Sequence, residues 1–223
     1  MSAARITVLL ADDHMVVLEG LRALLRTERD IEIVGEAATG RQAVRLAKAL
    51  KPDVVVMDIA MPQLNGLEAT RQITTAVPSS RVLILSSYCD DEYVEQLIDS
   101  GAAGYLLKQA AFTDVVRGIR EARRGNKFFS PAVSTRLTNL YRETVVRGTA
   151  VRKRADVLTS RETEVLQLIA EGAGNKQIAA ELGISVKTVE RHRERLMNKL
   201  DIHDIAGLTR YALCKGIIER KLP

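Results

Sequence analysis

The chain has 223 residues, a length that fits one large domain or two small ones. Hydrophobic residues make up 46% and charged residues 27%, which excludes a disordered chain, and aromatic residues make up only 4%, so the cores must be aliphatic. Residues 1–130 hold 16 basic and 17 acidic side chains, whereas residues 131–223 hold 17 and 11, which indicates nucleic-acid contact by the second part.

Short apolar segments alternate with amphipathic ones in the first part of the chain. The predicted strands are 6–10, 31–36, 54–57, 82–86 and 104–107. The predicted helices are 16–26, 41–50, 67–75, 92–100 and 113–124. This alternation is typical of βαβ units, so we predict an α/β domain of order (βα)5 with a parallel sheet.

The second part of the chain has a different pattern. Residues 131–142 predict one more helix, and the polar, basic segment 147–156 has no apolar period and reads as a linker. Four helices are predicted after it, at 161–170, 175–182, 186–200 and 205–214. We therefore expect three parts, which are a first domain at 1–127, a connecting helix and linker at 128–156, and an all-α domain at 157–223.

Polar residues follow four of the predicted strands at their carboxyl ends, where ligands bind in open α/β sheets. Asp12 and Asp13 follow the first strand, Asp58 the third and Lys108 the fifth, and Ser86 ends the fourth. Three carboxylates in one pocket repel one another unless a cation such as Mg²⁺ neutralises them. Lys108 and Ser86 would suit a phosphoryl group.

These residues belong to segments that resemble a response-regulator receiver domain: LLADDH (9–14), VVVMDIAMPQLNG (54–66), VLILSS (82–87) and GYLLK (104–108). The resemblance implies a flavodoxin-like fold with strand order 2-1-3-4-5. It implies that Asp58 accepts a phosphoryl group from a sensor histidine kinase and that Lys108 pairs with the phosphoryl oxygens. It also implies a switch in which Ser86 moves to bind the phosphoryl group and Tyr105 turns inward.

The same resemblance implies a magnesium site. Asp13 would bind Mg²⁺ directly and Asp12 largely through water, Asp58 would belong to the same metal site, and the Ala60 carbonyl would add a backbone ligand. An Asp after a strand can also be a helix cap, so Asp12 or Asp13 alone would not indicate a metal site. His14 is expected to be a surface or capping residue rather than a metal ligand.

The all-α part carries helix signals of its own. Thr159 and Glu162 form a capping-box pattern, Gly183 provides a tight turn, and Ser185 can cap the helix at 186–200. Three segments resemble the LuxR-type helix-turn-helix of the NarL/FixJ family: LTSRETEVLQLIAEG (158–172), NKQIAAELGISVKTVERH (175–192) and MNKLDI (197–202). The resemblance implies an all-α four-helix DNA-binding domain.

The polar face of the segment 186–200 has the period of a recognition helix in the major groove of DNA. Three side chains are expected to contact phosphates: Lys176, Lys187 and Thr188. Arg191 is expected to read guanine and Glu190 to accept from cytosine, and Glu194 lies on the same face. The apolar stripe of the last helix fits either a dimer surface or core packing.

These features predict a transcriptional response regulator of a bacterial two-component system, activated by phosphoryl transfer to Asp58, and not an enzyme. Its expected partners are a cognate sensor histidine kinase, double-stranded promoter DNA and, when phosphorylated, a second copy of the chain, with RNA polymerase as a further candidate. Two distant cysteines and no long apolar run favour a cytoplasmic protein with no membrane contact.

Two alternatives are weaker. A phosphorylation-independent regulator would not need the complete acidic pocket. A magnesium-dependent phosphohydrolase of the haloacid dehalogenase type would need a second Asp two residues after the nucleophile, where this chain has Ala60.

Overall fold

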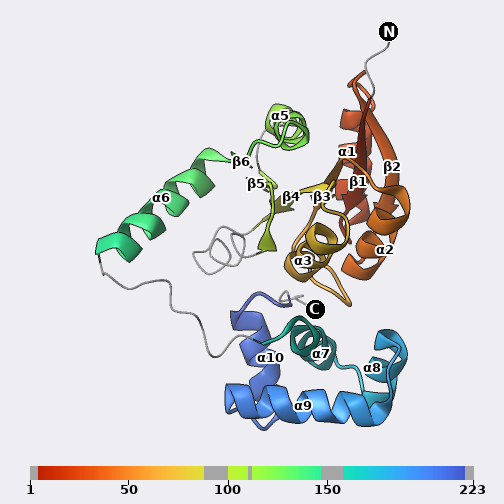
Figure 1. The fold of residues 1–223 in the computed structure, drawn as a ribbon, viewed down its shortest axis with the longest axis vertical. Coiled ribbons are helices and arrows are strands. Elements are labelled where there is room, and N and C mark those ends of the chain that lie inside the picture. Colours follow the sequence, from red (N-terminus) through yellow and green to blue (C-terminus); the bar gives the residue numbers. More distant parts are fainter. Residues whose placement is uncertain (1–4, 88–99, 110–111, 147–157, 219–223) are drawn as a thin grey trace.

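The structure is a computed structural model that describes residues 5–87, 100–109, 112–146 and 158–218. Figure 1 shows an α/β domain above a smaller helical domain. Most of the predicted helix 92–100 and the predicted linker 147–156 lie outside the described residues.

The sheet of the α/β domain is parallel, as predicted, with the order β2-β1-β3-β4-β5-β6. Its strands are β1 (Ile6–Ala11), β2 (Ile31–Ala37), β3 (Val54–Met57), β4 (Arg81–Ser86), β5 (Gly104–Leu107) and β6 (Phe128–Phe129). The prediction of five strands missed β6, in which Phe128 pairs with Gly104 and Phe129 with Tyr105. Two residues are too few to show a strand period in the sequence.

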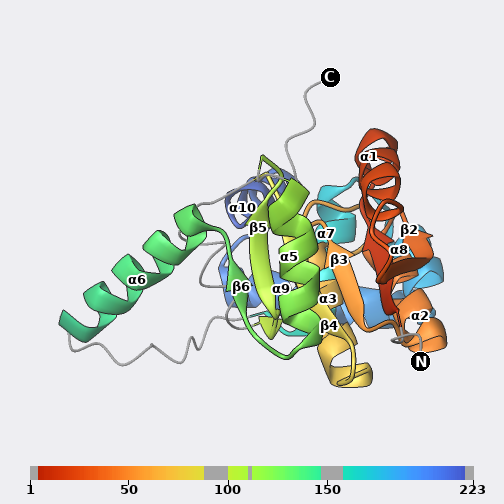
Figure 2. The ribbon, with the colours of Figure 1, turned by 90° about the horizontal axis from the view of Figure 1, so that it is seen from above.

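Helices cover both faces of this sheet (Figures 1 and 2). Apolar residues of α1 (Met15–Leu25) and α5 (Phe112–Arg123) share one core cluster with the strands. Those of α2 (Gly40–Leu50) and α3 (Gly66–Ala76) share the other, which also takes Val133 from α6 (Pro131–Val146). Strands buried on both faces are apolar throughout, which explains the short unbroken apolar runs in the sequence.

The helical domain consists of α7 (Ser160–Ala170), α8 (Asn175–Leu182), α9 (Val186–Leu200) and α10 (Ile205–Cys214) around one apolar cluster. The predicted capping box at Thr159 and Glu162 is present, and the Ser185 side chain accepts a hydrogen bond from the Thr188 N–H at the start of α9. Gly183 ends α8 in the left-handed conformation, with φ 61°. Among the described residues, no helix has the length and apolar character that a membrane crossing requires.

Candidate functional site

Two acidic residues meet at the carboxyl edge of the sheet because their strands are paired in register. Ala11 of β1 pairs with Met57 of β3, so the residues that follow them, Asp12 and Asp58, leave the sheet side by side. Both carboxylates are buried, at 2% and 3% exposure. Two buried like charges at this distance repel each other and need a positive partner.

Lys108 provides that positive charge from the end of β5. Its Nζ lies 2.8 Å from Asp12 Oδ2 and 3.1 Å from Asp58 Oδ2. Burial and the charge of Asp12 raise the pKa of Asp58 to about 6, although Lys108 opposes the shift. Burial alone would lower the pKa of Lys108, but its contacts with the two carboxylates raise it. The site is therefore a compact charge cluster. Its carboxylates favour binding of a further cation, and Lys108 favours binding of an anion beside it.

His14 and Asp13 complete this cluster at the mouth of the site. One ligand atom from each of Asp12, Asp13, His14 and Asp58 lies within 4.8 Å of the others. His14 Nδ1 is 3.1 Å from Asp12 Oδ1 and 3.0 Å from Asp13 Oδ1. As predicted, His14 is an exposed residue at the N-cap position of α1, although its side chain makes no capping hydrogen bond to the helix. The sequence analysis did not predict the contact of the ring with the two aspartates.

A tight loop, residues 59–65, carries the chain from the site to α3. The Gly66 N–H donates to the Ile59 carbonyl at 2.8 Å. A Cβ on Gly66 would lie 1.8 Å from the Asp58 carbonyl oxygen, so only glycine fits against the backbone of the site. Ala60, the predicted backbone ligand, lies in this loop and is partly buried.

The two predicted switch residues lie on neighbouring strands. Ser86 ends β4 and accepts the Lys108 N–H on its carbonyl at 2.8 Å. The Ser86 and Tyr105 residues are 1% and 0% exposed, so in this arrangement the tyrosine ring is already inside the domain. The structure thus places Ser86 at the carboxyl edge that holds the acidic cluster, whereas Tyr105 pairs with Ile84, two positions before that edge.

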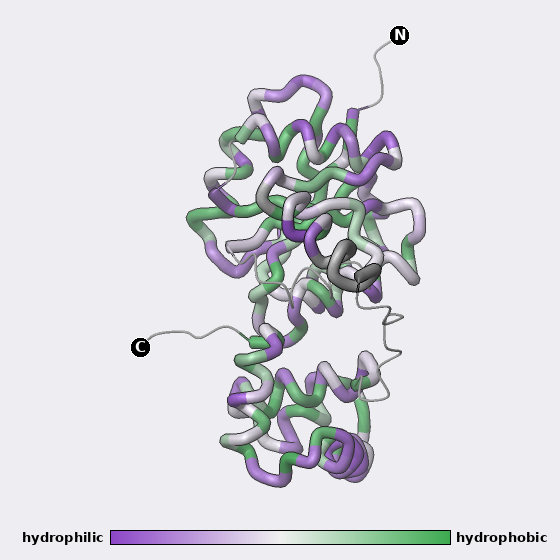
Figure 3. Tube along the Cα trace, turned by 90° about the vertical axis from the view of Figure 1, so that its left-hand side faces the viewer, coloured by the Kyte–Doolittle hydropathy of each residue, from purple (hydrophilic) through white to green (hydrophobic). Residues whose placement is uncertain are grey.

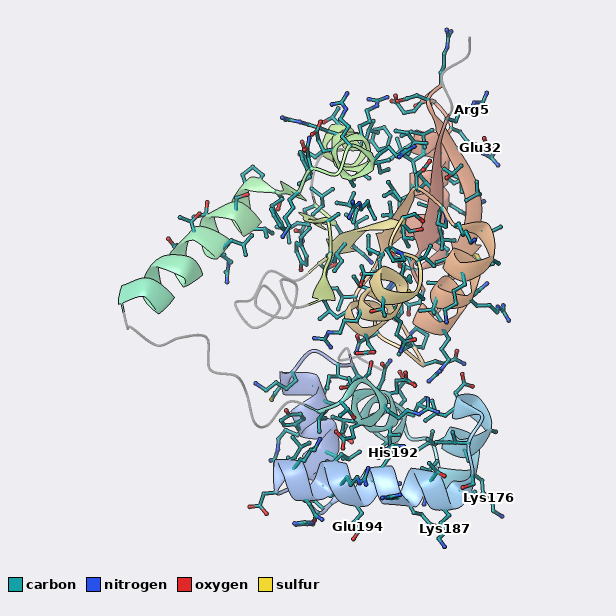
Figure 4. The ribbon with its side chains drawn as sticks, in the orientation of Figure 1. Arg5, Glu32, Lys176, Lys187, His192 and Glu194 are labelled. Atoms are coloured by element: carbon teal, nitrogen blue, oxygen red, sulfur yellow. The ribbon has the colours of Figure 1, made fainter. Side chains whose placement is uncertain are left out.

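The predicted nucleic-acid face is the outer side of α9 together with the start of α8. Five of its six predicted residues are exposed, and the sixth, Thr188, is half-buried with its hydroxyl 2.8 Å from that of Ser185. In Figure 4, Lys187 and Glu194 point away from the α/β domain, whereas His192 points into the helical domain. Burial and the nearby Arg161 lower the pKa of the His192 imidazole. Figure 3, which views α9 end-on, shows it as mostly hydrophilic.

An interdomain contact joins α7 and α8 to the loop 59–65, α2 and α3. The Gln167 side chain accepts the Asn65 N–H at 2.7 Å and donates to the Met61 carbonyl at 3.0 Å. Glu171 accepts the Gln63 N–H at 3.1 Å. The contact holds the loop that follows Asp58 against α7.

Charged side chains surround this interdomain contact. Glu164 accepts from Gln72 at 2.7 Å and lies 3.2 Å from the Arg41 guanidinium, which also lies 3.1 Å from Glu181. Ser160 at the start of α7 donates to Glu68, and burial raises the pKa of this glutamate. Sequence reasoning missed the whole contact, because polar residues on a helix carry no signal of a partner domain.

Comparison with known families assigns both parts of the chain. The family model for the response regulator receiver domain matches residues 8–120. The family model for the bacterial regulatory proteins of the luxR family matches residues 156–212. The two matches follow the division between the α/β domain and the helical domain.

Similar proteins extend over nearly the whole chain. The response regulator protein VraR of Staphylococcus aureus is 37% identical over 217 residues, which cover 96% of this chain and 99% of VraR. A structure of the RcsB response regulator of Salmonella typhimurium is similar at a TM-score of 0.57 and 29% identity, over 95% of this chain and 100% of RcsB. RcsB bound to the promoter rprA in the presence of phosphomimetic BeF₃⁻ gives a TM-score of 0.59 at 28% identity, over 93% and 98% of the two chains.

Proposed function

This chain belongs to the response regulators with a receiver domain and a LuxR-type DNA-binding domain, and we propose that phosphorylation of Asp58 controls its binding to promoter DNA. The observation that carries this proposal is the position of Lys108, whose ammonium group contacts both Asp12 and Asp58. A cation held beside a buried carboxylate is suited to a phosphoryl group bound to that carboxylate.

The phosphoryl donor in this proposal is a histidine side chain of a cognate sensor kinase. The ionised Asp58 carboxylate attacks phosphorus, the P–N bond breaks as the new P–O bond forms, and the electron pair returns to the kinase imidazole. Lys108 neutralises charge on the phosphoryl oxygens, and Ser86 donates a hydrogen bond to one of them. The product is an acyl phosphate on Asp58. Each chain accepts one phosphoryl group and does not turn over a substrate, so it is not an enzyme.

The acidic cluster fits a magnesium ion. Asp58 Oδ2 is buried and accepts no well-formed hydrogen bond from the described residues, although Lys108 Nζ lies 3.1 Å away. Asp12, Asp13, Asp58 and the Ala60 carbonyl would hold the ion, with oxygen donors of the kind that Mg²⁺ prefers. These residues would hold a Mg²⁺ whose charge would neutralise the carboxylates and the phosphoryl oxygens.

The interdomain contact supports a route from Asp58 to the DNA-binding domain. The loop 59–65 begins directly after Asp58, and Gln167 binds this loop at Met61 and Asn65. Phosphorylation would shift the loop and weaken its contact with α7. Because α9 lies on the far side of its domain from the receiver (Figure 1), the contact restrains the position of the recognition helix without covering it.

Two released copies would form a homodimer on DNA. Two-fold dimers of helix-turn-helix domains bind half-sites about 10 bp apart. A DNA-binding domain held against its own receiver domain would not be free to move to that spacing. Lys176, Lys187 and Thr188 would contact phosphates, while Glu190, Arg191 and Glu194 would face the bases. A cytoplasmic location and a contact with RNA polymerase complete this proposal.

Selection of bound sequences from a random DNA library tests the proposal. The purified chain is used with and without beryllofluoride and Mg²⁺, which mimic the phosphoryl group. Enrichment of a spaced two-fold site mainly with the mimic is the expected result. Equal enrichment in both arms would mean that the receiver does not control DNA affinity. Labelling of Asp58→Asn by acetyl phosphate would place the phosphorylation site elsewhere.

A further inference from the structure

His14 occupies the junction between the acidic cluster and α1. Its backbone takes the N-cap position of α1, but its side chain does not cap the helix. The ring instead faces the carboxylates, with Nδ1 3.1 Å from Asp12 Oδ1 and 3.0 Å from Asp13 Oδ1. An imidazole nitrogen therefore contacts two of the groups assigned above to the metal ion.

The backbone fixes this placement. The His14 N–H donates to Asp12 Oδ1 at 2.8 Å, which ties the start of α1 to the first carboxylate. The four ligand atoms from Asp12, Asp13, His14 and Asp58 lie within 4.8 Å of one another. A six-coordinate cation with ligand distances of about 2.1 Å has adjacent donors about 3 Å apart and opposite donors about 4.2 Å apart. The distances of 3.1 and 3.0 Å from His14 Nδ1 to the two carboxylates match adjacent positions, so one ion can contact the imidazole and these carboxylates together.

A nitrogen donor changes which ion such a site prefers. Mg²⁺ binds oxygen and sheds its water reluctantly, whereas first-row transition metals accept imidazole readily. Carboxylates, a carbonyl and one imidazole form a mixed set that suits Mn²⁺, which keeps octahedral geometry and tolerates nitrogen. The His14 side chain is 53% exposed, so an incoming ion reaches it without rearrangement of the core.

We propose that His14 is a ligand of the metal site and shifts its preference from Mg²⁺ toward Mn²⁺. The inference rests on the proposed function, because it takes the acidic cluster as a metal site. It differs from a purely structural role, in which the ring only donates a hydrogen bond to the carboxylates and its nitrogen lone pair never meets the ion.

Manganese spectroscopy on the full, unphosphorylated chain tests this role directly. Pulsed electron paramagnetic resonance of bound Mn²⁺ should show coupling to an imidazole nitrogen in the wild type and none in His14→Ala. Titration of the free Mn²⁺ signal should show an affinity loss of about tenfold in His14→Ala, while Mg²⁺ affinity from competition stays unchanged. His203→Ala is the matched control, since His203 is exposed on the DNA-binding domain beside Asp201.

Three results would overturn the proposal, and they differ in what they mean for the proposed function. Bound Mn²⁺ without nitrogen coupling in the wild type, or an equal loss of Mn²⁺ and Mg²⁺ affinity in His14→Ala, would reduce His14 to a hydrogen-bond donor and leave the proposed function intact. Failure of the wild type to bind either ion would overturn this proposal together with the metal site of the proposed function.

Discussion

Gln167 of α7 accepts the backbone N–H of Asn65 at 2.7 Å, and both residues are almost fully buried, at 1% and 3% exposure. Asn65 is the N-cap of α3, and its own side chain accepts the Glu68 N–H at 2.9 Å. One glutamine side chain of the DNA-binding domain thus accepts a main-chain N–H at the point where the loop after Asp58 ends and α3 begins. The loop that follows Asp58 and the helix α7 are therefore joined directly at this point.

Replacing Gln167 by Ala should loosen the interdomain contact. The change leaves the Asn65 N–H and the Met61 carbonyl without their partners, and each unmet buried group costs about 1–3 kcal/mol. Hydrogen exchange measured by NMR should show faster exchange of the Asn65 amide. The apolar clusters of the two domains do not include Gln167, so their amides should keep their protection.

Gln177→Ala is the control for this change. Its side chain accepts the Gly174 N–H at 2.8 Å within the DNA-binding domain and takes no part in the interdomain contact. Unchanged exchange at Asn65 in Gln167→Ala would show that water replaces the glutamine and that the contact does not depend on it.

The acidic site could be predicted from sequence because it depends on strand ends. Parallel strands in register bring their following residues together, so Asp12 and Asp58 had to meet once β1 and β3 were placed side by side. The ring of His14 could not be placed this way, since its direction depends on the turn into α1. In the sequence, Gln167 is an ordinary polar residue on a predicted helix. The residues around it carry no pattern that predicts its burial by a second domain.

Asp58→Asn should stabilise the unphosphorylated protein at neutral pH. The pKa of Asp58 is about 6, well above the ordinary value of 3.8, because burial and Asp12 disfavour its charge. The folded state therefore carries a cost at pH 7 that corresponds to about 2–3 kcal/mol, and the asparagine removes it. This cost disappears as the pH falls, because Asp58 is then protonated in both folded and unfolded states.

Urea unfolding followed by circular dichroism between pH 3.5 and 7.5 measures the effect. The difference in unfolding free energy between Asp58→Asn and wild type should be near zero at about pH 3.5 and grow through about pH 6 to a plateau. Glu19→Gln, a charge-removing change at an exposed position of α1, should show no such rise. A difference that stays flat across this range would mean that Asp58 titrates normally.

Gly66→Ala should disrupt the receiver domain. The added Cβ would lie 1.8 Å from the Asp58 carbonyl oxygen, and that backbone cannot retreat without breaking β3 from its neighbours. A loss of more than about 4 kcal/mol, or failure to fold, is expected from so close a contact. Gly20→Ala in α1 is the matched change, since no atom lies within 4 Å of its Cβ position and a gain of about 0.5–1 kcal/mol is expected. Thermal melting that ranks the two variants the other way would contradict the close packing of Gly66 on the site.

Lys187→Ala and Arg191→Ala should affect DNA binding in different ways. Lys187 is exposed in the first turn of α9 and points away from the receiver (Figure 4). As a phosphate contact it adds affinity without sequence information, so its loss should weaken all sequences by the same factor and reduce the slope of log affinity against log salt by about 1.

Arg191, one turn further along α9, is the contrasting case. An arginine paired with guanine discriminates between bases by about 1–3 kcal/mol, so its loss should lower affinity for the selected site much more than for random DNA. Fluorescence anisotropy at several salt concentrations, with both DNAs, measures the two effects. Lys48→Ala on the receiver helix α2 removes the same charge far from α9 and should leave every curve unchanged. If Arg191→Ala weakened both DNAs equally, Arg191 would be a phosphate contact, and base recognition would have to come from Glu190 or Glu194.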